Sequence, residues 1–284
     1  MKTIRLFILI LFTVSTWAHA ADNQTISNQA QENIQQMTKQ MNALGIPEAK
    51  AQKMLTRMHQ KRFQQQNIVR AQQTVMAAAK EGLPTEPIMN KAMEGMVKQA
   101  KEQQILKAME AVRSRHQYAY QMTRSLSNDK NTTEIMARAI VDSLTAGMPV
   151  QDMKRIAAQL QTRQQTKTQA KDLSLQSMLT VRTMARLGAM PTDVSDTVCL
   201  ALQHQYTSQQ MKELRHNFAS GTQQTSARQL ARQYAGTIDK GGNPGNSNDG
   251  DKSSGEKNSG GGSDSGGAGS DGGSGGGSGG GGSR

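Results

Sequence analysis

Leu44-Gly45-Ile46-Pro47 is the first of four short segments in which a run of helix-forming residues stops at glycine and resumes at proline. In such a corner the glycine takes the left-handed conformation just after a helix, and the apolar residue packs back on the last turn. Proline then opens the next helix at its first position, where its missing N–H costs nothing. The segments therefore predict helices joined by tight turns. The other three are Glu81-Gly82-Leu83-Pro84, Ala146-Gly147-Met148-Pro149 and Leu187-Gly188-Ala189-Met190-Pro191.

The chain around these corners favours helix throughout residues 21–235. Gln, Met, Ala, Lys, Arg and Leu dominate, and no run of alternating β-branched residues suggests a strand. Successive corner prolines stand 37, 65 and 42 residues apart, which is a loose period. We predict an all-α fold that is either an irregular multi-helix bundle or a short superhelical array of helical hairpins.

Apolar spacing and capping residues place the individual helices. A first helix lies within 27–44, a long second helix follows Pro47 to Gly82, and a third begins after Thr85. Whether the third helix continues past 101–104 stays open. A loop over 127–131 precedes a helix capped by Thr132 or Thr133. Gly95, inside the third helix, suggests a close approach of another helix. The remaining helices are expected over 134–146, 150–164, 173–187, 192–205, 208–219 and 227–234.

The two ends of the chain differ from this helical region. Residues 1–20 are typical of a secretory signal peptide, with Lys2 and Arg5 before an apolar stretch and Ala18-His19-Ala20 at the cleavage site. Nothing later has the ~20 apolar residues of a membrane span. We expect a soluble protein exported to the periplasm or secreted. Residues 236–284 are rich in Gly, Ser and Asp, which predicts a disordered tail.

The charge is strongly basic. The whole chain carries +12, and removing Lys2 and Arg5 leaves +10. Six acids and four bases from residue 237 onward make the tail −2, so residues 21–236 carry +12. This balance fits an anionic partner such as a polymer or a membrane surface, or equally a solvated surface with dispersed lysines and arginines.

Few residues suggest a chemical site. The one cysteine, Cys199, lies in an apolar stretch and is expected in the core. Methionines one turn apart, as at Met54 and Met58, could bind Cu(I), but the same spacing is that of a buried helix face. A cell-envelope hydrolase would need one of six glutamates in a desolvated cleft. We expect no catalytic residue, cofactor or metal. The six glutamates are Glu81, Glu94, Glu102, Glu110, Glu134 and Glu213.

One short segment concentrates arginine, histidine and tyrosine. It could contact an anion or a partner, or it could be an ordinary exposed helix face. Its candidate residues are Arg113, Arg115, His116, Tyr118 and Tyr120.

These patterns favour an exported, non-enzymatic helical protein that binds another macromolecule, as an adaptor or chaperone does. Surfaces rich in Met and Gln adapt to varied contacts. The alternative is a basic module that binds an anionic polymer or a membrane surface. Salt distinguishes the two, because polymer binding collapses as ionic strength rises whereas apolar binding persists. Oligomeric state stays open.

Overall fold

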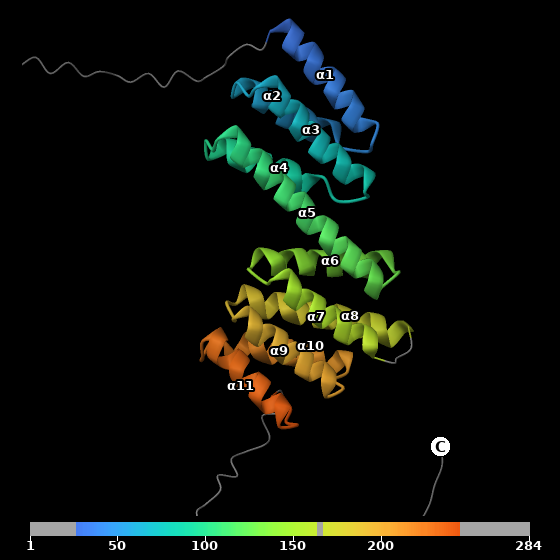
Figure 1. Ribbon diagram of the computed structural model, residues 1–284, viewed down its shortest axis with the longest axis vertical. Coiled ribbons are helices and arrows are strands. Elements are labelled where there is room, and N and C mark those ends of the chain that lie inside the picture. The colour runs from blue at the N-terminus through green and yellow to red at the C-terminus, as the bar shows by residue number, and fades with distance from the viewer. Residues whose placement is uncertain (1–26, 164–166, 245–284) are drawn as a thin grey trace, which may run out of the picture. The chain divides into compact units, whose positions relative to one another are not determined.

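The computed structural model describes residues 27–163 and 167–244 (Figure 1). In these residues the chain forms eleven helices and no strand, which confirms the all-α fold. The predicted signal peptide and most of the predicted tail lie outside the described residues. No helix in the described ranges is long and apolar enough to cross a membrane. The helices are α1 (Asn28–Asn42), α2 (Glu48–Gln60), α3 (Gln65–Lys80), α4 (Glu86–Val97), α5 (Glu102–Leu126), α6 (Lys130–Thr145), α7 (Val150–Thr162), α8 (Lys167–Arg186), α9 (Pro191–Gln203), α10 (Ser208–Gly221) and α11 (Ala227–Asp239).

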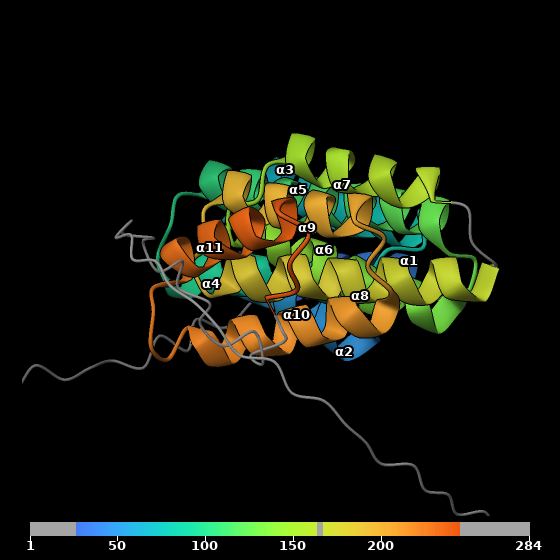
Figure 2. The ribbon, with the colours of Figure 1, turned by 90° about the horizontal axis from the view of Figure 1, so that it is seen from below.

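Each helix packs mainly on helices one or two positions away along the chain. In the second half α6, α8 and α10 follow one another in one layer, and α7, α9 and α11 follow one another in a second layer (Figures 1 and 2). Long-range side-chain hydrogen bonds join residues from 30 positions apart, as for Arg115 and Thr145, to 43 positions apart, as for Arg163 and Tyr206. A sequence separation of 30–43 residues corresponds to about two helices. This is typical of stacked helical hairpins, in which each unit contacts only its neighbours.

Two groups of buried apolar side chains hold the helices together, and α5 contributes to both. The first group comes from α1 to α4 and the N-terminal half of α5, and the second comes from the C-terminal half of α5 to α11. Methionine supplies much of the first core, where its flexible side chain fills irregular spaces. Its buried methionines are Met37, Met41, Met54, Met58, Met89, Met96 and Met109.

The four glycine corners have the predicted left-handed backbone. The φ angles of Gly45, Gly82, Gly147 and Gly188 are 77°, 69°, 101° and 90°. After each glycine the next N–H bonds back to a carbonyl five residues earlier, which satisfies an otherwise unpaired helix end. The four bonds are Ile46 to Met41 at 3.3 Å, Leu83 to Ala78 at 2.9 Å, Met148 to Ser143 at 3.0 Å and Ala189 to Met184 at 3.1 Å.

The prediction that every corner proline occupies the first helical position was wrong for three of the four. Pro47 and Pro149 are the N-cap residues of α2 and α7, and Pro84 precedes the N-cap Thr85. One residue between glycine and proline leaves Pro47 and Pro149 with extended ψ angles of 119° and 147°. Only Pro191 opens its helix, because the additional residue Met190 takes the N-cap position.

Three further corners have the same geometry without glycine. Arg62, Gln99 and Gln205 have φ of 58°, 54° and 63°, and each stands 17 residues after a corner glycine. The long helix expected from Pro47 to Gly82 is therefore broken into α2 and α3, and α4 ends before α5 begins. The following apolar residues again bond back to the helix, at 3.1 Å from Phe63 to Met58, 3.0 Å from Ala100 to Gly95 and 2.9 Å from Tyr206 to Ala201.

The short helices after the glycine corners are copies of one packing unit. Counting from each glycine, the residues one, six and ten positions later are buried in all four copies. Residue 164, the counterpart of the three left-handed non-glycine residues in the α7 copy, lies outside the described ranges. The buried sets are Ile46, Leu83, Met148 and Ala189, then Ala51, Ile88, Met153 and Val194, and then Leu55, Ala92, Ala157 and Val198.

The sequence also predicted the N-cap of α6, the end of α11 and a close contact at Gly95. The N-cap of α6 is Asp129, whose carboxylate accepts from the Thr132 N–H at 2.8 Å, and not Thr132 or Thr133. Helix α11 continues past residue 235 to Asp239. A close helix contact at Gly95 is confirmed, since a Cβ there would lie 2.6 Å from Cγ1 of Ile105.

Candidate functional site

A groove of about 580 Å³ lies between α2 and α4. Helix α4 supplies its apolar side through Met93 and Val97, and α2 supplies mostly polar residues. Val97 is 72% exposed, the highest value among the large apolar residues of the described ranges. The groove is lined by Ala49, Gln52, Lys53, Thr56, Arg57, Gln60, Met93 and Val97.

The position of Val97 follows from the helical period. The face of α4 that packs in the core carries Ile88, Met89, Ala92 and Met96, so Val97 falls beside that face at the last position of the helix. An isolated exposed valine is ordinary on a protein surface, but an exposed valine inside a concave surface next to another apolar side chain fits contact with a partner.

Two cations line the groove on the α2 side. Lys53 and Arg57 have no carboxylate partner among the described residues, and Arg57 Nη1 donates to Gln60 Oε1 at 3.4 Å. No carboxylate is among the lining residues. The groove therefore combines an apolar wall with uncompensated positive charge.

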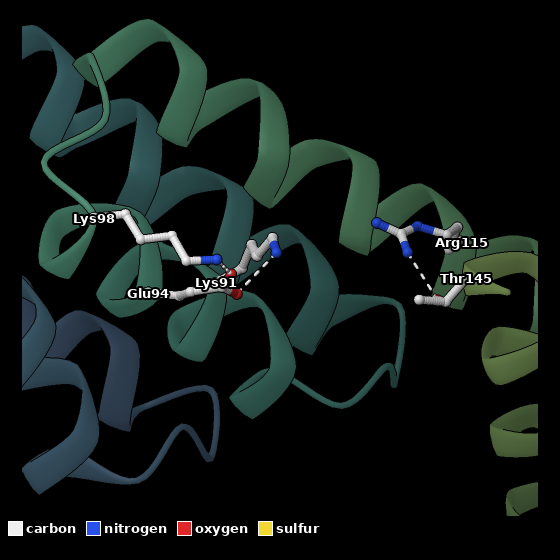
Figure 3. Close-up of polar contacts among 5 residues, drawn as sticks. All are labelled: Lys91, Glu94, Lys98, Arg115 and Thr145. Carbon is white, nitrogen blue, oxygen red and sulfur yellow. Dashed lines mark hydrogen bonds and ion pairs between the residues drawn. The ribbon is translucent and has the colours of Figure 1, made fainter.

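The carboxylate next to the groove on α4 is already neutralised. Lys91 and Lys98 donate to the two oxygens of Glu94 at 2.8 and 2.6 Å (Figure 3). These hydrogen bonds and the two lysine charges lower the pKa of Glu94 to about 2. Because this carboxylate is bonded to Lys91 and Lys98, it does not cancel the charges of Lys53 and Arg57.

The segment of α5 that the sequence singled out does not form one surface. Arg113 bonds to Glu81, and it donates to Glu110 Oε1 at 2.7 Å. The hydrogen bond to Glu81 is the main cause that raises the pKa of Arg113. The Arg113 charge is therefore paired with carboxylates on α5 and at the end of α3. Tyr120 lines a different cavity, which also contains Gly82 and Arg124.

Two other residues of that segment, Arg115 and Tyr118, bond to α6 and α7. Arg115 Nη1 donates to Thr145 Oγ1 at 2.9 Å (Figure 3), and Tyr118 Oη donates to the carbonyl of Val150 at 3.2 Å. Burial raises the pKa of Tyr118 to about 12. His116 is buried, its Nδ1 has no partner in the structure, and burial followed by the nearby Arg115 charge lowers its pKa. Arg115 and Tyr118 thus hold the α6–α7 corner against α5.

The remaining sequence candidates are Cys199, the methionine pairs and the six glutamates. Cys199 is buried, as predicted, and burial raises the pKa of its thiol. Met54 and Met58 are fully buried in the first core. No cluster of three His, Cys, Asp or Glu residues that could hold a metal occurs within the described ranges. The six candidate glutamates all have polar partners, which are Arg113 for Glu81 and Glu110, Lys91 and Lys98 for Glu94, Gln64 and Asn67 for Glu102, Arg138 for Glu134 and Gln209 for Glu213.

The sequence did not reveal the groove, although it contained two signals. Val97 follows the apolar face of α4 by one residue, and Lys53 and Arg57 are one turn apart on α2. Only the α2–α4 contact brings them together. Comparison with protein-family models, with curated proteins and with solved structures finds no match for this chain.

Proposed function

We propose that this protein is a non-enzymatic helical adaptor of the cell envelope that binds another protein through the α2–α4 groove. The observation that carries the proposal is the exposed Val97 side chain in a groove that also presents the unpaired cations Lys53 and Arg57. The envelope location rests on the signal peptide predicted at residues 1–20.

The chemistry of the groove favours an amphipathic helical segment of a partner. Helix α2 has 13 residues, so the groove beside it runs for about 20 Å and accommodates roughly three turns of a helix. A partner helix would place apolar residues against Met93 and Val97 and carboxylates near Lys53 and Arg57. This is the helix-in-groove type of recognition, in which apolar anchors give affinity and charges give orientation.

Site-specific photocrosslinking in the producing cells tests the proposal. A photoreactive phenylalanine analogue replaces Val97, and the same analogue at the exposed Gln121 on α5 is the matched control. We expect a discrete protein adduct from position 97 that is absent from position 121. The Lys53→Glu/Arg57→Glu variant should abolish the adduct, because it reverses the charge of the groove without changing its apolar wall.

The result that contradicts the proposal is equally definite. Adducts of the same proteins in the same yield from both positions would mean that position 97 has no specific partner. An adduct that survives the charge reversal would mean that the groove cations do not take part. With the partner identified, binding should persist in moderate salt, because the Val97 contact is apolar.

A further inference from the structure

Arginines are in excess around a single carboxylate on α6. Arg182 and Arg186 of α8 both point a guanidinium nitrogen at the same oxygen of Asp142, at 3.8 and 3.7 Å. Arg115 of α5 reaches Thr145, which lies one turn after Asp142 on α6. One carboxylate cannot neutralise two guanidinium groups, so positive charge remains on this part of the surface.

A fourth arginine extends the cluster to the next helix. Arg215 of α10 donates to the amide oxygen of Gln176 at 2.8 Å, and no carboxylate bonds to it in the described residues. Burial is the main cause that lowers the pKa of Arg215, and the nearby positive charge of Arg182 lowers it further. Arg215 therefore adds a positive charge near Arg182 that no carboxylate of the described residues pairs with.

The packing of the helices places these side chains in sequence. The pairs α5 and α6, α6 and α8, and α8 and α10 are all in direct contact. Three interhelical steps of 8–10 Å correspond to a length of roughly 25–30 Å. We call Arg115, Arg182, Arg186 and Arg215 the arginine row. With Asp142 its formal charge is +3.

In the second layer, formed by α7, α9 and α11, two arginines are each paired with a carboxylate. Arg155 of α7 pairs with Asp196 of α9 at 2.6 Å, and Arg232 of α11 pairs with Asp193 of α9 at 3.2 Å. Each of these arginines has its own carboxylate on a neighbouring helix. The arginine row thus carries an excess of positive charge that these two arginine–carboxylate pairs do not.

We infer that the arginine row binds a linear polymer of phosphate groups. The planar guanidinium has several donors in a fixed geometry that matches phosphate oxygens, which makes arginine well suited to phosphate recognition. The arginine row draws on α5, α8 and α10 around Asp142 of α6, so successive phosphates of one polymer can be contacted by arginines from different helices. This site is separate from the α2–α4 groove and does not depend on the adaptor proposal.

Fluorescence anisotropy of the full exported chain tests the inference with two labelled probes, inorganic polyphosphate and single-stranded DNA. The Arg182→Gln/Arg186→Gln variant should weaken binding about tenfold at low salt. The slope of log affinity against log salt should become smaller by roughly 1.4, which corresponds to two lost phosphate contacts with a single strand. The preferred probe identifies the source of the phosphates, and a preference for either one supports the row.

The Arg155→Gln/Arg232→Gln variant is the matched control, because it removes the same two charges from the paired layer. Its affinity should change by less than about twofold, since screened charges outside the contact contribute little. Asp142→Asn should raise affinity about threefold, because it removes the single carboxylate of the cluster. A purely structural role of Arg182 and Arg186 would not produce this gain.

The inference is overturned if the two double variants lose affinity equally, because binding would then depend on net charge alone. It is also overturned if Asp142→Asn fails to raise affinity. Binding to vesicles containing anionic phospholipid, without binding to either polymer probe, would assign the row to a membrane surface and refute the polymer. Circular dichroism of each variant confirms that the helices are retained.

Discussion

Replacing Gln99 and Gln205 by glycine should stabilise this protein, although neither change adds a contact. Both residues hold the left-handed backbone at helix corners, with φ of 54° and 63°, and both side chains are exposed. A non-glycine residue pays about 1–2 kcal/mol for this conformation, because its Cβ crowds the following carbonyl oxygen. Glycine removes that cost at the same corner geometry seen at Gly82 and Gly188.

The gain is partly offset in the unfolded chain. Glycine has more conformations to lose on folding, which costs about 0.5–1 kcal/mol. The net stabilisation should be about 0.5–1 kcal/mol at each site. Gln99 precedes α5 beside the first core and Gln205 precedes α10 in the second, so the two effects should add to about 1–2 kcal/mol. For a domain of this size that raises Tm by about 2–8 °C.

Thermal and urea unfolding followed by far-UV circular dichroism measures the effect. Gln121→Gly is the matched control, because Gln121 is an exposed residue in the interior of α5, where glycine costs about 1 kcal/mol. The same substitution should therefore stabilise at two positions and destabilise at the third. If glycine lowers Tm at positions 99 and 205 as it does at 121, the backbone argument for these corners is refuted.

Three further substitutions test separate parts of the structure. Gly95→Ala should cost about 1–3 kcal/mol in urea unfolding, because its Cβ would overlap Ile105, and Ile105→Ala in the same chain should recover part of the loss. The free energy of unfolding should have its full value above pH 6.5, the ordinary histidine pKa, and should fall as pH drops below it. Burial lowers the pKa of His116, so the unfolded chain binds a proton that the folded chain resists. His116→Gln should therefore reduce the dependence of the urea midpoint on pH. Glu102→Gln should cost about 1–2 kcal/mol, because its carboxylate accepts from the backbone N–H of Gln64 at 3.1 Å at the N-terminus of α3, and an unchanged urea midpoint would contradict this.

Much of the fold could be predicted because its signals are local. A glycine that must adopt positive φ, an apolar residue after it and a proline near the next helix start all act within five residues. The corners at Gly45 and Gly147 were therefore predicted from the sequence, and so was the burial of Cys199 within an apolar stretch. The corner at Arg62 was missed, because one long helix was predicted from Pro47 to Gly82. A helix end at 205 was predicted and a break near 101–104 was left open, but the left-handed backbone of Gln99 and Gln205 was not predicted, since a left-handed glutamine has no mark in the sequence that distinguishes it from a helical one.

The candidate sites needed the tertiary structure. Arg113 and Arg115 are two residues apart in α5, yet the first pairs with Glu81 of the preceding helices and the second bonds to Thr145 of the next. A linear segment that looked like one charged patch was thus divided between two neighbours. The arginine row shows the reverse. Its members lie on helices that are tens of residues apart in the sequence, and only the stacking of these helices brings them together.

The sequence by itself determined that this chain is helical, where most of its helices turn, and which residues of each helix are buried. These properties depend on backbone sterics and on the 3.6-residue period, which each segment carries alone. The tertiary structure decided which helix meets which, and therefore where Lys53 and Val97 share a groove and where Arg182 and Arg186 compete for Asp142. Such groupings depend on contacts between distant segments, and no local pattern specifies them.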